Sequence, residues 1–127
     1  MHTARLVIPT DTVDEYGHVN YKNFPRLFEP AQDDVIYRKI FGFAAIEKHW
    51  GLRSFVKRLS VTYEGQLLAG EQATITTDLT LGNTSVTFAQ KMVTKRGPVA
   101  SLELVVVLVT ADGRPCPIPP DLRELLK

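Results

Sequence analysis

The chain has 127 residues, of which 44% are hydrophobic, and a formal net charge of +1. This length fits one domain and leaves no room for separate cofactor and substrate domains. The balanced charge excludes a general nucleic-acid binder, which needs a basic surface, and the ordinary apolar fraction excludes a disordered chain. We therefore expect one domain spanning residues 1–127.

The N-terminus and the cysteine content indicate a cytoplasmic protein. The first residues contain no long apolar segment of the kind found in signal peptides. The longest apolar run, residues 104–109, is much shorter than the about 20 residues that cross a bilayer. The single cysteine, Cys116, excludes an internal disulfide and fits a reducing compartment. We expect no association with a membrane.

The first third of the chain predicts a strand, a polar loop and a long helix. Residues 4–9 are a short apolar run closed by a proline, which favours a strand. The loop 14–20 reads DEYGHVN. Residues 21–41 then place apolar side chains at three- and four-residue steps, as in a helix with one buried face. Pro25 fits the first turn of this helix, whereas Pro30 lacks a needed N–H and predicts a kink or a later start.

The rest of the chain has the two-residue period of β-strands, after a variable stretch at 42–51. A hairpin dipeptide, Gly82-Asn83, joins two of these strands, and a turn at 96–98 joins the next pair. The continuous β-branched residues near the end of the last strand predict a central strand, and residues 121–127 predict a final helical turn. The predicted strands are residues 53–65, 71–81, 84–95 and 99–110.

These elements predict an α+β protein with an antiparallel sheet of about five strands wrapped around one long helix. The helix has an apolar face and no second helical layer to cover it, so the sheet is the surface that can bury it. A single sheet of this size leaves an open edge that favours pairing with a second copy. We therefore expect a homodimer or a homotetramer.

Four segments resemble a known family, and they occur in its order and spacing over nearly the whole chain. They are DEYGHVNYKNF (14–24), FEPA (28–31), GNTSVTF (82–88) and DGRPCPIP (112–119). The chain is similar to acyl-CoA thioesterases of the 4-hydroxybenzoyl-CoA thioesterase type, which have the hotdog fold. The resemblance implies hydrolysis of an acyl-CoA to a free carboxylic acid and CoA, without a metal or organic cofactor.

The resemblance assigns the two catalytic groups. Asp14, three residues before Gly17, corresponds to the catalytic carboxylate, and the backbone N–H of Tyr21 to the group that polarises the thioester carbonyl. A carboxylate can attack the carbonyl or deprotonate water, and a helix N-terminus directs free N–H groups at negative charge. The alternative for Asp14 is a solvated turn residue, because aspartate is a favoured turn former.

The other predicted contacts divide between the acyl group and CoA. The acyl group is expected beside the helix, against Tyr16, Phe24 and Phe28, and Gly17 allows the backbone to come close to the substrate. The resemblance places the CoA nucleotide on the hairpin and the C-terminal turn. The residues assigned to it are Asn83, Thr84, Ser85 and Arg114.

Two loop residues keep two interpretations each. His18 either holds substrate or water, or packs against the start of the helix. Asn20 either touches the substrate or caps the helix. The histidines are scattered and form no pair with cysteine at ligand spacing, so no metal site is expected.

The sequence departs from the family pattern at the first acid, where Asp11 is displaced by one position, and at Gln32, which replaces a common arginine. The hairpin also lacks the basic residue that some relatives have.

Two alternatives to an acyl-CoA thioesterase stay open. One is a non-catalytic hotdog domain that binds acyl-CoA, and the other is a thioesterase that acts on acyl carrier protein.

Overall fold

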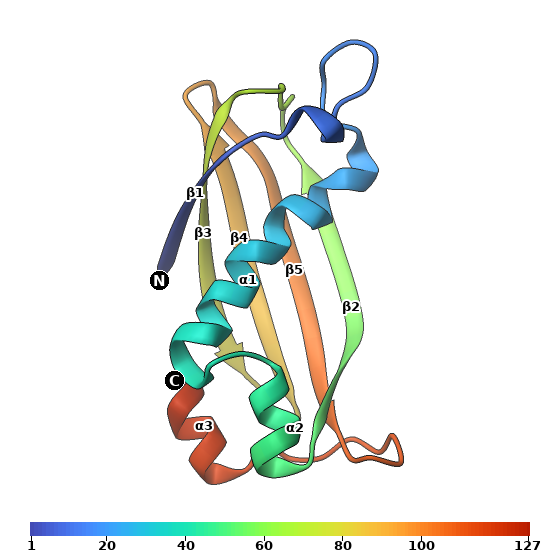
Figure 1. The fold of residues 1–127 in the computed structure, drawn as a ribbon, viewed down its shortest axis with the longest axis vertical. Helices are drawn as coiled ribbons and strands as arrows, with labels where there is room; N and C mark the ends of the chain where they lie inside the picture. Colours follow the sequence, from blue (N-terminus) through green and yellow to red (C-terminus); the bar gives the residue numbers. More distant parts are fainter.

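Five antiparallel strands and one long helix make up most of the computed structural model, which describes residues 1–127 (Figure 1). The elements in chain order are β1 (His2–Val7), the 3-10 turns η1 (Thr10–Thr12) and η2 (Tyr21–Asn23), α1 (Phe24–Ile40), α2 (Ala44–Trp50), β2 (Arg53–Tyr63), β3 (Gln72–Leu81), β4 (Ser85–Thr94), β5 (Gly97–Val109) and α3 (Pro120–Leu126). The predicted α+β class and hotdog architecture are confirmed.

The long helix differs in detail from its prediction. A 3-10 turn occupies the first residues of the predicted range, and α1 begins at Phe24 with Pro25 in its first turn. Pro30 lies inside the continuous helix, so the predicted later start is wrong. The variable stretch contains α2, which ends at Gly51 in the left-handed region (φ 67°). Seven residues are too few for a clear helical period, which explains why α2 was not predicted.

The sheet order is β1-β3-β4-β5-β2. Neighbours β3, β4 and β5 follow one another through short turns, as the hairpin and turn signals predict. The strand β2 does not pair with β3, which follows it in the chain. It crosses to the far edge and pairs with β5, so β5 is an interior strand with partners on both sides. One edge of the sheet is therefore β1 and the other is β2.

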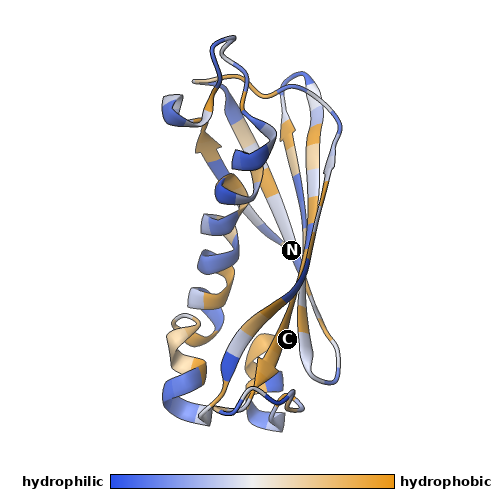
Figure 2. Ribbon diagram, turned by 90° about the vertical axis from the view of Figure 1, so that its right-hand side faces the viewer, coloured by the Kyte–Doolittle hydropathy of each residue, from blue (hydrophilic) through white to orange (hydrophobic).

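The helix α1 lies along one face of the sheet, and no helix covers the opposite face (Figure 2). Its apolar side faces inward, where Phe28 is 0% exposed and Ile36 is 1% exposed. The buried side chains form two clusters, one toward each end of α1. Between the two clusters lies a buried polar network, in which Gln32 donates to Gln90 (2.8 Å) and Gln90 donates to Thr77 (3.0 Å).

The edge strand β2 is exposed along nearly its whole length. Its apolar side chains reach solvent, with Phe55 64%, Val56 56% and Leu59 46% exposed. The helix α1 contacts β3 and β1, and its first residue, Phe24, packs against Tyr63 at the end of β2. No helix of the structure has both the length and the apolar character needed to cross a membrane.

Candidate active site

The loop before α1 folds back on itself and holds the Asp14 side chain in a fixed place. The Asp14 N–H donates to the His18 carbonyl (2.8 Å), and the Gly17 N–H donates to the Asp14 carbonyl (3.1 Å). Gly17 has a φ of 79°, which glycine adopts without steric cost. The N–H groups of Tyr16 and His18 both donate to Asp14 Oδ1, at 2.9 and 3.1 Å. These bonds orient the carboxylate and use only one of its two oxygens.

The backbone of the turn η2 is held on both sides. The Asn20 side chain accepts the Lys22 N–H (3.3 Å), and the Asn20 carbonyl accepts the Asn23 N–H (2.9 Å). The Asn23 side chain donates to the Thr12 carbonyl (2.9 Å), which ties the turn to the preceding segment. Tyr21 is the first residue of the turn, so its own N–H has no acceptor within it. Asn20 therefore caps the turn, which is one of the two roles predicted for it.

These two features border one open groove of about 380 Å³. Five predicted site residues line it, namely Asp14, His18, Asn20, Tyr21 and Phe24. The remaining lining residues are Val19, Tyr63, Gly65, Gln66 and Leu67. A carboxylate and a helix N-terminus therefore meet at the same surface. The His18 ring forms no hydrogen bond with another protein group, so it is also available to a ligand.

Three predicted substrate contacts lie outside the groove. Tyr16 is 75% exposed at the tip of the loop, and Phe28 is fully buried in the core. Gly17 shapes the loop but does not line the groove. The helical spacing predicted that Phe28 lies on the same face of the helix as Phe24. At Phe28, about one turn further along, this face is buried against the sheet, so Phe28 does not reach the groove.

The far wall of the groove comes from the end of β2 and the loop 64–71, which the sequence analysis did not include in the site. The Val19 N–H donates to the Leu67 carbonyl (2.7 Å), and His18 forms a bridge with Leu68. In the sequence, this loop is indicated by the break in the two-residue alternation after Tyr63. That break indicates a loop but not its neighbours, because the loop reaches the site only through tertiary contacts.

An ion pair fixes this wall. Arg96, in the β4–β5 turn, donates two hydrogen bonds to the Glu71 carboxylate, both at 2.8 Å, and one to the Gln66 carbonyl (2.9 Å). The Arg96 hydrogen bonds, with those from the Leu68 N–H and with the Arg96 charge, hold the pKa of the Glu71 carboxyl below its ordinary value of 4.5, although burial opposes this.

The two segments predicted to bind the CoA nucleotide, the β3–β4 turn and the loop after β5, lie at the opposite end of the sheet from the loop before α1 (Figure 1). Asn83 and Thr84 lie in the β3–β4 turn, Ser85 is the first residue of β4, and Arg114 follows β5. The strand β3 spans 10 residues, and at about 3.3 Å per residue the two ends are roughly 30 Å apart. Arg114 is paired with Asp112 (2.9 Å) and its side chain is 78% exposed. One copy of the chain does not bring these residues to the groove.

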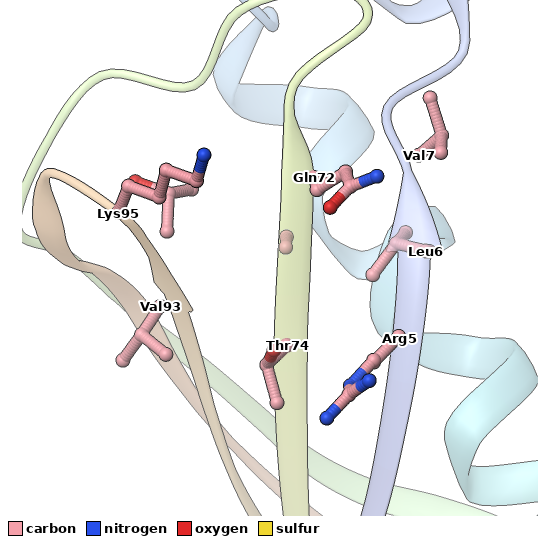
Figure 3. A pocket seen from close by; sticks show the side chains of 9 residues that line it. Arg5, Leu6, Val7, Gln72, Thr74, Val93 and Lys95 are labelled. Carbon is pink, nitrogen blue, oxygen red and sulfur yellow. The ribbon is translucent and has the colours of Figure 1, made fainter.

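A larger hollow of about 630 Å³ lies over the ends of β1, β3 and β4 (Figure 3). Arg5, Gln72 and Thr74 border it. They alternate along their strands with inward-facing residues such as Ala73, which is 3% exposed. This hollow therefore opens on the sheet face that points away from α1, and it contains none of the predicted site residues. No three His, Cys, Asp or Glu side chains gather as a metal site would require.

The fold is that of the hotdog thioesterases. Residues 7–126 match the model of the thioesterase-like superfamily, and the chain belongs to this family. The family predicted from the motifs is confirmed. The predicted enzyme class, a thioester hydrolase, is confirmed as well. No curated protein matches the chain in sequence.

Solved structures share the fold over nearly the whole chain. A predicted thioesterase from Bacillus stearothermophilus is 29% identical, with 98% of this chain and 92% of that chain covered and a TM-score of 0.81. A hypothetical protein from Aquifex aeolicus is 22% identical, with both chains covered completely and a TM-score of 0.89. A 1,4-dihydroxy-2-naphthoyl-CoA thioesterase from Synechocystis is 11% identical, with 98% and 93% covered and a TM-score of 0.87.

Proposed function

We propose that the chain hydrolyses acyl-CoA thioesters in the groove beside Asp14. The observation that carries this proposal is the meeting of an oriented carboxylate and the unpaired N–H of Tyr21 at one open surface. The similarity to a fold that also serves a naphthoyl-CoA thioesterase supports CoA as the thiol half of the substrate.

The chemistry follows from the roles of these two groups. The thioester carbonyl oxygen lies at the Tyr21 N–H, which stabilises the negative charge that develops on it. Asp14 either attacks the carbonyl carbon, or takes a proton from a water molecule that attacks. In the first route the C–S bond breaks, CoA leaves as the thiolate, and water hydrolyses the mixed anhydride. Both routes give the free acid and CoA, and both need the Asp14 oxygen that accepts no backbone hydrogen bond.

Replacing Asp14→Asn tests the carboxylate without removing the turn. The asparagine carbonyl oxygen can still accept the N–H groups of Tyr16 and His18, so the loop keeps its shape. We expect kcat to fall by about 10²–10⁴-fold, as for loss of a general base. Glu15→Gln is the matched control, because this neighbouring carboxylate is exposed and lies outside the groove.

Turnover is measured with short-chain, long-chain and aromatic acyl-CoAs, and with the same acyl group on acyl carrier protein. Near-wild-type turnover by the Asp14→Asn variant would contradict the mechanism. CoA-dependent thermal stabilisation of the wild type without hydrolysis of any substrate would instead favour a non-catalytic binding domain. A preference for the carrier protein would change the proposed thiol partner.

We also propose that the site is completed by a second copy of the chain, as a homodimer or as a dimer within a tetramer. The exposed edge of β2 presents unpaired backbone groups and apolar side chains, including Phe55 and Leu59. Two copies that pair through this edge about a two-fold axis have antiparallel β2 strands. The end of one copy that carries Arg114 then lies near the groove of the other.

Mixing two inactive variants tests this arrangement. Asp14→Asn and Arg114→Ala are assayed alone at a low acyl-CoA concentration, and then after equal mixing with exchange of subunits. If each site takes Asp14 from one copy and Arg114 from the other, random mixing restores about a quarter of the wild-type sites. No gain over the two separate activities would show that Arg114 does not serve the partner's groove. Sedimentation measures the oligomer in the same samples.

A further inference from the structure

We propose that Tyr63 is a positioning residue that holds the oxyanion donor of Tyr21 in place. This inference rests on the proposed function, because it assigns a role within the same site. Tyr63 is the last residue of β2. Its hydroxyl donates a hydrogen bond to the Tyr21 carbonyl at 2.8 Å, across 42 positions of the chain.

The backbone geometry explains how this bond acts on the donor. The Tyr21–Lys22 peptide is held from both sides, because its carbonyl accepts from Tyr63 and from the Phe24 N–H, and its N–H donates to Asn20. The preceding peptide is fixed through the Asn20 carbonyl. In a trans peptide the N–H points away from the carbonyl, so these bonds together fix the direction of the Tyr21 N–H.

The Tyr63 ring makes a second attachment to the same region. It packs edge-to-face on Phe24, with ring centroids 5.0 Å apart and an interplanar angle of 81°. Beyond Tyr63, the N–H groups of Glu64 and Gly65 both donate to the Val99 carbonyl, which anchors the end of the strand to β5. A rigid strand end therefore supports the first turn before α1. A fixed donor stabilises a developing oxyanion without reorganisation during the reaction.

The substitution Tyr63→Phe removes the hydroxyl and keeps the ring. We expect kcat to fall by about tenfold, less than the roughly 10²–10³-fold that loss of an oxyanion donor costs, because the N–H itself remains. KM should stay within about twofold, because a donor that acts on the transition state contributes little to substrate binding. Tyr37→Phe is the matched control, since this exposed tyrosine lies on α1 outside the groove and its hydroxyl has no partner.

Amide hydrogen exchange gives a readout that does not depend on activity. Exchange of the Lys22 N–H should be faster in Tyr63→Phe than in the wild type and unchanged in Tyr37→Phe. Unchanged kcat and exchange in Tyr63→Phe would overturn the positioning role, and a rise in KM alone would show that the hydroxyl contacts substrate instead. If Asp14→Asn keeps wild-type turnover, the proposed function fails and the role of Tyr63 fails with it. Loss of activity in Asp14→Asn but not in Tyr63→Phe rejects only the role of Tyr63.

Discussion

The two ends of the molecule differ in how their polar groups are used. At the site end, residues 13–23 and 64–71 carry backbone and ion-pair hydrogen bonds beside an apolar cluster, and they leave a carboxylate oxygen and an N–H open. At the closed end, α2, α3 and the β3–β4 turn seal the core. Leu122 is fully buried there, and Arg123 donates to the Gly82 carbonyl at 2.7 Å.

The difference lies in the polar contacts, because both ends contain a buried apolar cluster. At the closed end, apolar packing is combined with hydrogen bonds between elements, such as the one from Arg123 to the Gly82 carbonyl. The site end has an apolar cluster of its own, which includes Phe24 and Leu67, and its loops add polar bonds to the backbone that fix positions while leaving functional atoms exposed. The buried network of Gln32, Gln90 and Thr77 lies between the two apolar clusters, so each cluster packs largely within its own end.

The largest expected effect comes from breaking the closed end. Phe88→Ala removes a side chain that is 0% exposed and packs near Phe43. The lost burial and the cavity should reduce the free energy of unfolding by about 3–5 kcal/mol. Chemical denaturation measures this loss. Val93→Ala on the same strand is the control, because Val93 is 41% exposed and such changes usually stay within about 0.5 kcal/mol.

If the two ends are independent, the folded fraction of Phe88→Ala keeps the wild-type kcat. Kinetics are therefore measured at a temperature where the variant is folded. A large fall in kcat under these conditions would show that packing at the closed end is transmitted to the groove.

A smaller effect is expected from the ion pair at the site end. Because the pKa of Glu71 is lowered in the folded protein, its contribution to stability is fully present above its ordinary value of 4.5 and is lost as the pH falls through the lowered pKa. The Arg96 side chain is 47% exposed, so solvent weakens the pair. We expect Glu71→Gln to cost about 1 kcal/mol or less near neutral pH.

The measurement is the difference in unfolding free energy between the wild type and Glu71→Gln from pH 7 to pH 3. This difference should shrink below about pH 4.5, as Glu71 becomes protonated in the wild type. Glu124→Gln, at an exposed pair with Lys127, provides a comparison outside the site. A difference that does not change with pH would show that the charge of Glu71 does not stabilise the loop.

Local patterns predicted much of the fold and part of the site. Two-residue alternation located the strands, and the Gly82-Asn83 dipeptide located their hairpin. The motif around Asp14 and Gly17 predicted a carboxylate next to a helix start, and the groove contains both Asp14 and Tyr21. These features succeed because each depends on residues close together in the chain.

The missed features depend on distant contacts. Nothing near Tyr63 in the sequence shows that β2 crosses to the edge beyond β5 and brings its hydroxyl to Tyr21. The helical period alone does not show that Phe28 is buried in the core while Phe24 lines the groove. It also does not reveal that Arg114 lies at the other end of the sheet.

The sequence by itself determined the five strands and the long helix, the α+β class, the family and the carboxylate that precedes the helix. These follow from periodicity, turn chemistry and short motifs, which act over a few residues. Only the tertiary structure decided which wall faces Asp14 and which residue binds the Tyr21 carbonyl. Those outcomes depend on strand order and burial, because they are set by side chains that meet only after the sheet has formed around α1.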